Sequence, residues 1–329
     1  MPNIRLATFN VENLLMRCDF NAAGVENLRE RLTNISSPEK AASVSSVFNV
    51  LSEDDRTLTA QALAATRADI CAVQEVENLV TLTTFHNKYL ARWTDRVLPH
   101  HVLCEGNDPR GIDVGLLSRL EIVRTVSHAQ ASFASLGIKP PKGVHANERV
   151  FRRDCLEVDV IKDRAVLTLF VCHFKSMHGG REKSWKIRDG EARGVRAIIQ
   201  SRFANPAQEN WVILGDLNDY IEIDGAADTA HGLGALLGNG FAYDMALLCL
   251  KAPKERWSHY YPVLKQYSAL DHILLSPRLV DLNRKASISY VRAGMPWRAT
   301  RHKGYRLAGV GWSDPKASDH CPLVAAIEF

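Results

Sequence analysis

The chain has 329 residues, 46% hydrophobic and 24% charged, which is typical of a globular protein that buries a large core without disulfide or metal staples. The formal net charge of +4 is compatible with an anionic substrate but does not require nucleic acid. No apolar stretch approaches the roughly 18 residues of a membrane span, and the N-terminal residues lack the pattern of a signal peptide.

The seven cysteines are odd in number, widely spaced and without a C-x-x-C motif. This usage favours free thiols in a reducing compartment over a disulfide framework. We therefore expect a cytoplasmic protein.

Hydrophobic periodicity predicts short strands interspersed with helices. In chain order these are a strand over 4–10, helices near 25–32 and over 56–66, a strand over 70–73, a helix over 77–90, strands over 101–103 and 112–117, a hairpin of strands 156–161 and 166–172, a helix over 181–203, and strands over 211–214, 269–275 and 323–327. The hairpin argues against a simple parallel sheet. With no repeat or linker to divide the chain, we predict one domain over residues 1–329, with insertions near 19–55 and 277–317.

Acidic, amide and histidine side chains recur at the ends of the predicted strands. They are Asn10, Glu12, Glu75, Asp113, His173, Asp216, Asn218, Asp271, His272, Asp319 and His320. Loops at strand ends are where scaffolds carry catalytic groups, although a single loop acid is more often a helix cap or a solvated group. The predominance of oxygen ligands indicates Mg²⁺ or Mn²⁺ rather than structural zinc.

Five segments in this set resemble the motifs of one family. They are Thr8–Leu14, Gln74–Val76, Gly215–Asn218, Leu270–Leu274 and Ser318–Pro322. They are similar, in content and order, to motifs of the endonuclease/exonuclease/phosphatase family, the superfamily of DNase I. The resemblance spans residues 4–327 and implies an α/β fold, a four-layer α-β-β-α sandwich of two mixed sheets with outer helices.

The resemblance also implies a divalent metal, Mg²⁺ or Mn²⁺, at one end of the sheets. Glu75 would be its principal ligand, with Asn10 and Glu12 beside it. Asp319 would be a further ligand or a carboxylate at a second metal position. Glu12 stands where some members of the family have aspartate.

The same comparison implies the catalytic groups. Asp216 would orient or deprotonate the attacking water, and Asn218 would hold the phosphate or the water. His320 would act with Asp271, which fixes its tautomer and raises its basicity. His173 would donate to the scissile phosphate; the alternative is a core histidine bonded to a backbone carbonyl.

Three basic residues have open roles. Arg110 either clamps a substrate phosphate or pairs with an aspartate to secure its turn. Lys175 and Arg188 either face the substrate or solvate the helix that follows them, and for Arg188 we predict solvation. His272 is interpreted as a structural neighbour of Asp271.

These features predict a metal-dependent phosphoester hydrolase, a phosphodiesterase or nuclease that works by in-line attack of water on phosphorus. The alternatives are a small-molecule or lipid-headgroup phosphohydrolase and a non-catalytic binding protein on the same scaffold. The expected partner is a phosphoester substrate, with nucleic acid as one option. Basic and aromatic residues between Trp297 and Trp312 would suit a nucleic-acid backbone, or form a solvated surface.

Overall fold

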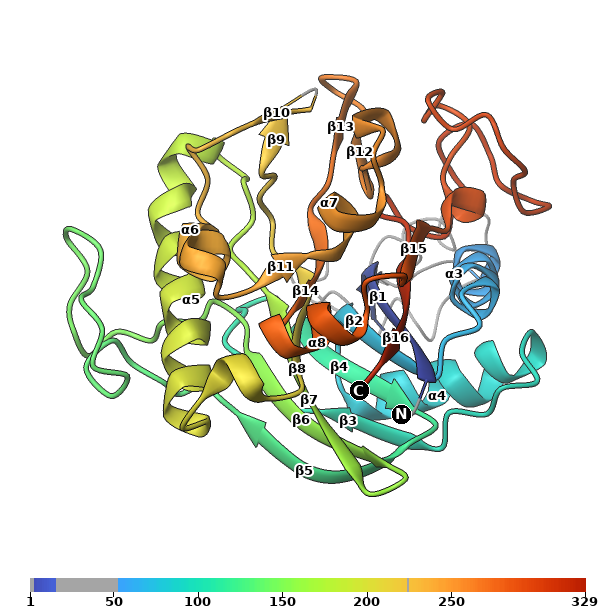
Figure 1. The fold of residues 1–329 in the computed structure, drawn as a ribbon. Helices are drawn as coiled ribbons and strands as arrows, with labels where there is room; N and C mark the ends of the chain where they lie inside the picture. Colours follow the sequence, from blue (N-terminus) through green and yellow to red (C-terminus); the bar gives the residue numbers. More distant parts are fainter. Residues whose placement is uncertain (1–2, 16–52, 224) are drawn as a thin grey trace, which may run out of the picture.

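The computed structural model describes residues 3–15, 53–223 and 225–329. Two six-stranded mixed sheets form its centre (Figure 1). The first has the order β15 (Ser287–Tyr290), β16 (Leu323–Glu328), β1 (Asn3–Leu14), β2 (Ile70–Val76), β4 (Asp113–Ser118) and β3 (His100–Leu103). The second has the order β11 (Tyr243–Asp244), β14 (Asp271–Leu275), β8 (Trp211–Asp216), β7 (Ala165–His173), β6 (Cys155–Lys162) and β5 (Glu121–Ser127).

The sheets pack face to face because their strands carry apolar residues on both faces. Along β1, Leu6 belongs to the same buried cluster as Leu169 of β7, between the sheets. Phe9, further along β1, packs instead in a cluster with Leu63 of α3 (Glu53–Ala65) and Phe85 of α4 (Leu79–Lys88). On the far side, β7 and β8 bury their other face against α5 (Arg181–Arg202). This is the predicted α-β-β-α sandwich.

The predicted strands and helices are present within a few residues of their expected bounds, apart from the helix near 25–32, which lies outside the described residues. Short elements that were not predicted are β9 (Glu222–Ile223), β10 (Ala226–Ala227), β12 (His259–Tyr261), β13 (Gln266–Ser268), α6 (Gly234–Leu237), α7 (Met245–Cys249) and α8 (Pro277–Leu282). Strands β5, β11 and β15 were also missed. Strand β15 lies inside the predicted insertion 277–317 and pairs with β16 at the edge of the first sheet.

Two general expectations can be compared with the described ranges. No helix in them combines the length and apolar character needed to cross a membrane. The six cysteines that they contain are all free thiols, as predicted.

Each sheet contains one parallel pair, β1 with β2 and β7 with β8, and these pairs position the polar strand ends. Asn10 and Glu75 lie toward the carboxyl ends of the first pair, where its register shifts after Asn10, and His173 and Asp216 end the second. The two pairs end at the same edge of the sandwich, since Asn10 Nδ2 lies 3.0 Å from Asp216 Oδ2. Strand β14 runs antiparallel to β8 and brings Asp271 opposite Asp216.

Candidate active site

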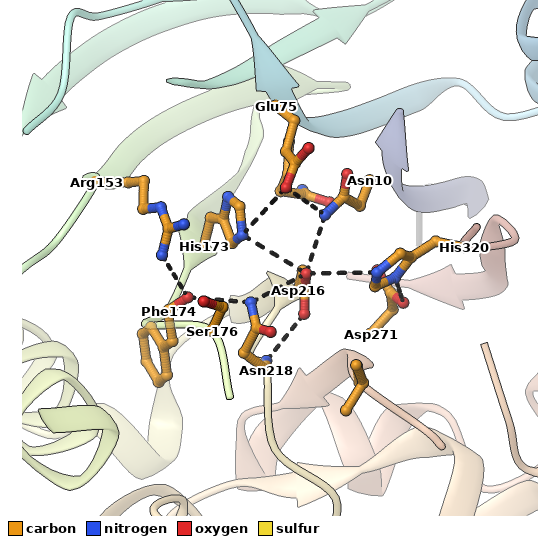
Figure 2. Close-up of polar contacts among 12 residues, drawn as sticks. Asn10, Glu75, Arg153, His173, Phe174, Ser176, Asp216, Asn218, Asp271 and His320 are labelled. Atoms are coloured by element: carbon orange, nitrogen blue, oxygen red, sulfur yellow. Dashed lines mark hydrogen bonds and ion pairs between the residues drawn. The ribbon is translucent and has the colours of Figure 1, made fainter. Parts of the chain in front are cut away.

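A cavity of about 620 Å³ opens at this edge. Of the predicted site residues, those that line it are Asn10, Glu12, Glu75, Arg110, His173, Asp216, Asn218, Asp319 and His320. The two that do not line it are Asp271, which bonds the lining residue His320, and Lys175. Polar groups from both sheets therefore converge on one cavity (Figure 2).

The Asp216 carboxylate lies at the centre of this group (Figure 2). Its Oδ2 accepts hydrogen bonds from Asn10 Nδ2 at 3.0 Å and Asn218 Nδ2 at 3.1 Å. The same oxygen lies 3.6 Å from His173 Nε2 and 3.8 Å from His320 Nε2. Burial raises the pKa of Asp216 to about 6, with help from the charge of Asp271 and against that of His320. A carboxylate with a pKa near neutrality is suited to general-base work.

His320 and Asp271 form a close pair, with 2.7 Å between His320 Nδ1 and Asp271 Oδ2. Burial alone would lower the pKa of His320, but the charges of Asp271 and Asp216 outweigh it and hold that pKa well above its usual value. The adjacent Asp319 faces another histidine, with its Oδ2 3.7 Å from His259 Nε2. The two neighbours in sequence thus have different partners.

The pKa of His173 is shifted in the opposite direction from that of His320. Burial, and next the charge of Arg153, hold the pKa of His173 well below its usual value, which favours the neutral imidazole. Its Nε2 lies 3.9 Å from Glu75 Oε1, while its buried Nδ1 has no hydrogen-bond partner among the described residues. The backbone-bonded core histidine considered as an alternative is therefore not the arrangement seen.

Asn218 is held tightly beside Asp216. Its Nδ2 donates to Phe174 O at 3.1 Å and to Asp216 Oδ2, and its backbone N–H donates to Asp216 Oδ1 at 2.9 Å. Both amide hydrogens are therefore engaged within the protein. A contact of Asn218 with phosphate or water stays a prediction.

Several residues that line the cavity have a strained backbone conformation, which helps to set the direction of their side chains. Four non-glycine lining residues have left-handed backbone conformations: Glu12 (φ 52°), Asn13 (φ 58°), Glu75 (φ 68°) and Asn218 (φ 52°). At Glu75 the strain coincides with a register shift in the pairing of β2 with β4, as expected for a bulge that redirects a side chain. Such conformations cost of order 1–3 kcal/mol each and persist where the surrounding structure holds them, commonly at functional sites.

The donor set fits a hard divalent cation. Asn10 Nδ2 donates to two carboxylates, to Glu75 Oε1 at 3.3 Å and to Asp216 Oδ2 at 3.0 Å, so a single neutral group separates these negative charges. Carboxylate and amide oxygens are the ligands that Mg²⁺ and Mn²⁺ prefer. Asp216, Asp271 and His320 also come within metal-ligand range of one another, but His320 Nδ1 and Asp271 Oδ2 already bond each other. The Asn10 oxygen Oδ1, the atom that could bind a metal, accepts the backbone N–H of Glu12 at 3.0 Å, so the roles of Glu75 and Asn10 as ligands stay predictions.

The other two predicted ligands lie further round the cavity. Glu12 Oε1 pairs with Lys316 Nζ at 3.0 Å, and its Oε2 accepts the backbone N–H of Asp319 at 2.7 Å. Both oxygens of Glu12 are thus engaged, whereas the Asp319 side chain is 37% exposed. Their roles as ligands stay predictions.

Arg110 combines both interpretations offered for it. It forms a bidentate pair with Asp108, from Nε to Oδ1 and from Nη2 to Oδ2, both at 3.1 Å, and it also lines the cavity. Lys175 folds onto its neighbour, with Nζ 3.2 Å from Ser176 Oγ. Arg153 was not predicted from the sequence. It is a buried cation that lines the cavity, and its Nε lies 2.8 Å from Asp108 Oδ2.

The predicted solvation of Arg188 is wrong. Arg188 is 0% exposed and its Nε donates to Asp219 Oδ2 at 2.9 Å, because the buried stripe of α5 includes position 188. Asp219 also accepts from Arg181 Nε at 2.6 Å. This buried network fixes the segment that follows Asn218.

Replacing Arg188 by methionine is expected to lower the free energy of unfolding by about 3 kcal/mol, since breaking a buried ion pair costs roughly 3–5 kcal/mol and Arg181 still neutralises Asp219. Urea unfolding measures the change. The matched control is Arg193→Met in the same helix, whose half-buried pair with Asp189 should be worth about 0–1 kcal/mol. Equal losses in the two variants would contradict the buried network.

Residues 5–296 match the model of the Endonuclease/Exonuclease/phosphatase family. No curated protein matches the chain. The matched range contains the strand-end residues from Asn10 to Asp271 and stops before Asp319 and His320.

Solved structures share the fold at low sequence identity. TDP2 from D. rerio, complexed with a single-strand DNA product, has a TM-score of 0.54 and 14% identity over 99% of both chains. A family protein from Leptotrichia buccalis has a TM-score of 0.55 and 14% identity, over 99% of this chain and 100% of that one. The human Nocturnin catalytic domain with bound sulfate has a TM-score of 0.56 and 14% identity, over 100% of this chain and 94% of that one. These likenesses confirm the predicted fold.

Proposed function

The chain belongs to the endonuclease/exonuclease/phosphatase family, and from that premise we propose that it is a divalent-metal-dependent phosphodiesterase that cleaves nucleic acid. Endonucleases, exonucleases and phosphatases all hydrolyse phosphoesters, so the family is one of phosphoester hydrolases. The observation that carries the proposal is the Asp216 carboxylate, which Asn10, Asn218 and two histidines surround on one wall of an open cavity.

In the proposed reaction, Asp216 orients the attacking water and accepts its proton as the water oxygen bonds to phosphorus and the bond from phosphorus to the leaving oxygen breaks. The imidazolium of His320, held by Asp271, places a positive charge and an N–H donor 3.8 Å from Asp216 Oδ2. Neutral His173 donates from Nε2 to an equatorial phosphoryl oxygen, and Asn218 holds Asp216 in place. Fixed donors aimed at developing charge are commonly the largest single contribution to catalysis.

Glu75 and Asn10 are the proposed ligands of Mg²⁺ or Mn²⁺, which when bound would polarise the phosphoryl oxygen and offset charge on the leaving group. Glu12 and Asp319 are candidates for a further ligand or second position. Arg110 and Arg153 extend the cationic wall of the cavity beside His173, where they suit a phosphate. Lys175 stays a candidate substrate contact in the same region.

We further propose that residues 1–329 act as one catalytic domain, because the proposed site needs residues from both ends of the chain. Asn10 lies on β1, and Ser318 Oγ donates to its backbone carbonyl oxygen at 2.8 Å. A cytoplasmic location would suit the free thiols of the described residues.

A metal and substrate panel tests the proposal. We expect turnover of at least one polynucleotide, among single-stranded DNA, double-stranded DNA and RNA, with Mg²⁺ or Mn²⁺, and none after chelation by EDTA, because the cation that would offset charge on the leaving group is then removed. Asp216→Ala serves as the blank. If the protein hydrolyses bis-p-nitrophenyl phosphate but none of the polynucleotides, the small-molecule or lipid-headgroup alternative is favoured. Absence of turnover on every substrate would favour a binding protein on the same scaffold.

A further inference from the structure

A second cavity, of about 520 Å³, lies beside the candidate active site. Its walls come from β9, β13, the segment around Pro253 and Arg301. Strands β9 and β13 lie at the end of the molecule that Figure 1 shows at the top. None of the residues predicted for catalysis or metal binding lines this cavity.

The second cavity carries unpaired positive charge. Four cations line it, and only Arg256 has a carboxylate partner among the described residues, a bidentate pair with Glu222 at 2.6 Å for both contacts. Lys254, Lys265 and Arg301 have none within the described ranges. Three uncompensated cations around a concave site favour an anionic ligand.

The exposed residue Arg301 packs its guanidinium against an aromatic ring. Its guanidinium carbon lies 4.2 Å from the centre of the Tyr267 ring, and its backbone N–H donates to Tyr267 Oη at 3.0 Å. Lys265 sits in the tight turn between β12 and β13 with φ 52°. The contact with Tyr267 restricts the Arg301 guanidinium at the cavity wall, which lowers the entropic cost of binding an anion there.

The two cavities are adjacent, since Tyr220, Leu264, Gln266 and Ser268 line both of them. The shared wall is firmly supported, because the Arg181 guanidinium lies 3.6 Å from the centre of the Tyr220 ring. A ligand with one phosphate near Asp216 would have to extend past this wall to reach the second cavity. A strand with phosphates at regular intervals has that reach.

We propose that the second cavity is a subsite for a phosphate of single-stranded nucleic acid, on a nucleotide beside the scissile one. The inference rests on the proposed phosphodiesterase function and narrows its substrate class to extended single strands. A flexible strand can bend past the shared wall, whereas a rigid duplex cannot follow two adjacent hollows as closely. An anionic membrane is less well matched, because these cations surround a hollow rather than a flat face.

Binding can be measured apart from hydrolysis. The test variant is Lys265→Asn with Arg301→Gln, where asparagine tolerates the left-handed conformation of position 265. The probe is fluorescein-labelled oligothymidylate, in EDTA, followed by fluorescence anisotropy. We expect the dissociation constant to rise about tenfold and the slope of log affinity against log salt to fall by about 0.7, the change expected for the one phosphate that the variant no longer neutralises.

The matched control is Lys139→Ala with Lys142→Ala, which removes the same charge from exposed positions that line neither cavity. Its affinity should change by no more than about twofold, since screening weakens distant charges. If the control and test variants weaken binding equally, or if the wild-type protein does not bind the oligonucleotide, the subsite is refuted. Lys254→Gln, on a separate segment, should shift binding in the same direction, and thermal unfolding checks that each variant folds.

Two further measurements, steady-state kinetics and binding to vesicles, complete the test. With metal, kcat/KM of the test variant should fall about tenfold on the oligonucleotide but stay within about twofold on bis-p-nitrophenyl phosphate, which is too short to reach the subsite. Weakened oligonucleotide binding in a protein without turnover would refute the hydrolase and keep the subsite. Loss of binding to vesicles of equal parts phosphatidylcholine and phosphatidylserine, with oligonucleotide binding unchanged, would assign the cavity to a membrane and overturn the proposal.

Discussion

Asp216→Asn is expected to lower kcat by on the order of 10²–10⁴-fold, the usual contribution of a positioned acid–base group. The substitution removes the charge and the basicity of the group that accepts hydrogen bonds from Asn10 and Asn218. It keeps the volume of the side chain, so the fold should remain. Steady-state kinetics at saturating Mg²⁺ or Mn²⁺ measure the loss, and circular dichroism checks the fold.

Asp113→Asn is the matched control for this experiment. Asp113 is also a buried carboxylate at the end of a strand, but it accepts the backbone N–H of Gly106 at 2.8 Å and does not line the cavity. Burial raises its pKa to about 6, as it does for Asp216, so the control carries a similarly shifted carboxyl group outside the cavity. If both variants lose the same activity, Asp216 is not the acid–base group.

His320→Ala and Asp271→Asn should each lower kcat by at least about 10²-fold, and the double variant should be little worse than the more damaging single one. The reason is that each residue acts through the other, across the 2.7 Å contact between His320 Nδ1 and Asp271 Oδ2. A double-mutant cycle on kcat measures this coupling. Losses that multiply would show that the two residues contribute independently.

A second buried histidine–aspartate pair provides the control. His272 follows Asp271 directly, and its Nδ1 lies 2.6 Å from Asp244 Oδ2 on the side of β14 away from the cavity. His272→Gln is expected to lower the unfolding temperature while kcat stays within a few-fold of wild type. The contrast separates loss of a buried pair from loss of the catalytic pair.

The strand-end residues could be predicted because they follow from two readable patterns. Continuous apolar runs such as Trp211–Leu214 mark strands buried on both faces, and a polar residue directly after such a run lies at the sheet edge. The resemblance then supplied the order of the motifs. Residues as distant as Asn10 and Asp216 could therefore be assigned to one site without a structure.

Arg188 and Arg153 show where sequence reasoning stops. A charged residue in a helix is usually solvated. Because α5 contains many basic residues, the sequence did not distinguish Arg188, which is buried, from the others. A signal was present, because Ser184, Arg188, Glu191 and Val195 follow the helical repeat of a buried face. Arg153 lies in a loop without periodicity, and only the fold brings it beside Asp108 and Phe174.

The second cavity could not be predicted from the sequence, for a related reason. Strands β9, β12 and β13 are two or three residues long, too short to leave a periodic pattern. The sequence did show basic and aromatic residues between Trp297 and Trp312, but not that Arg301 would stack on Tyr267. Partners brought together by short hairpins depend on tertiary packing.

The arrangement of β1 between β2 and β16 has a consequence for synthesis of the protein. Strand β16 follows the other strands of the described residues in the sequence, and Ser318 just before it bonds the backbone of Asn10. The first and last motifs of the proposed site thus meet only when the ribosome has translated almost the whole of this sequence.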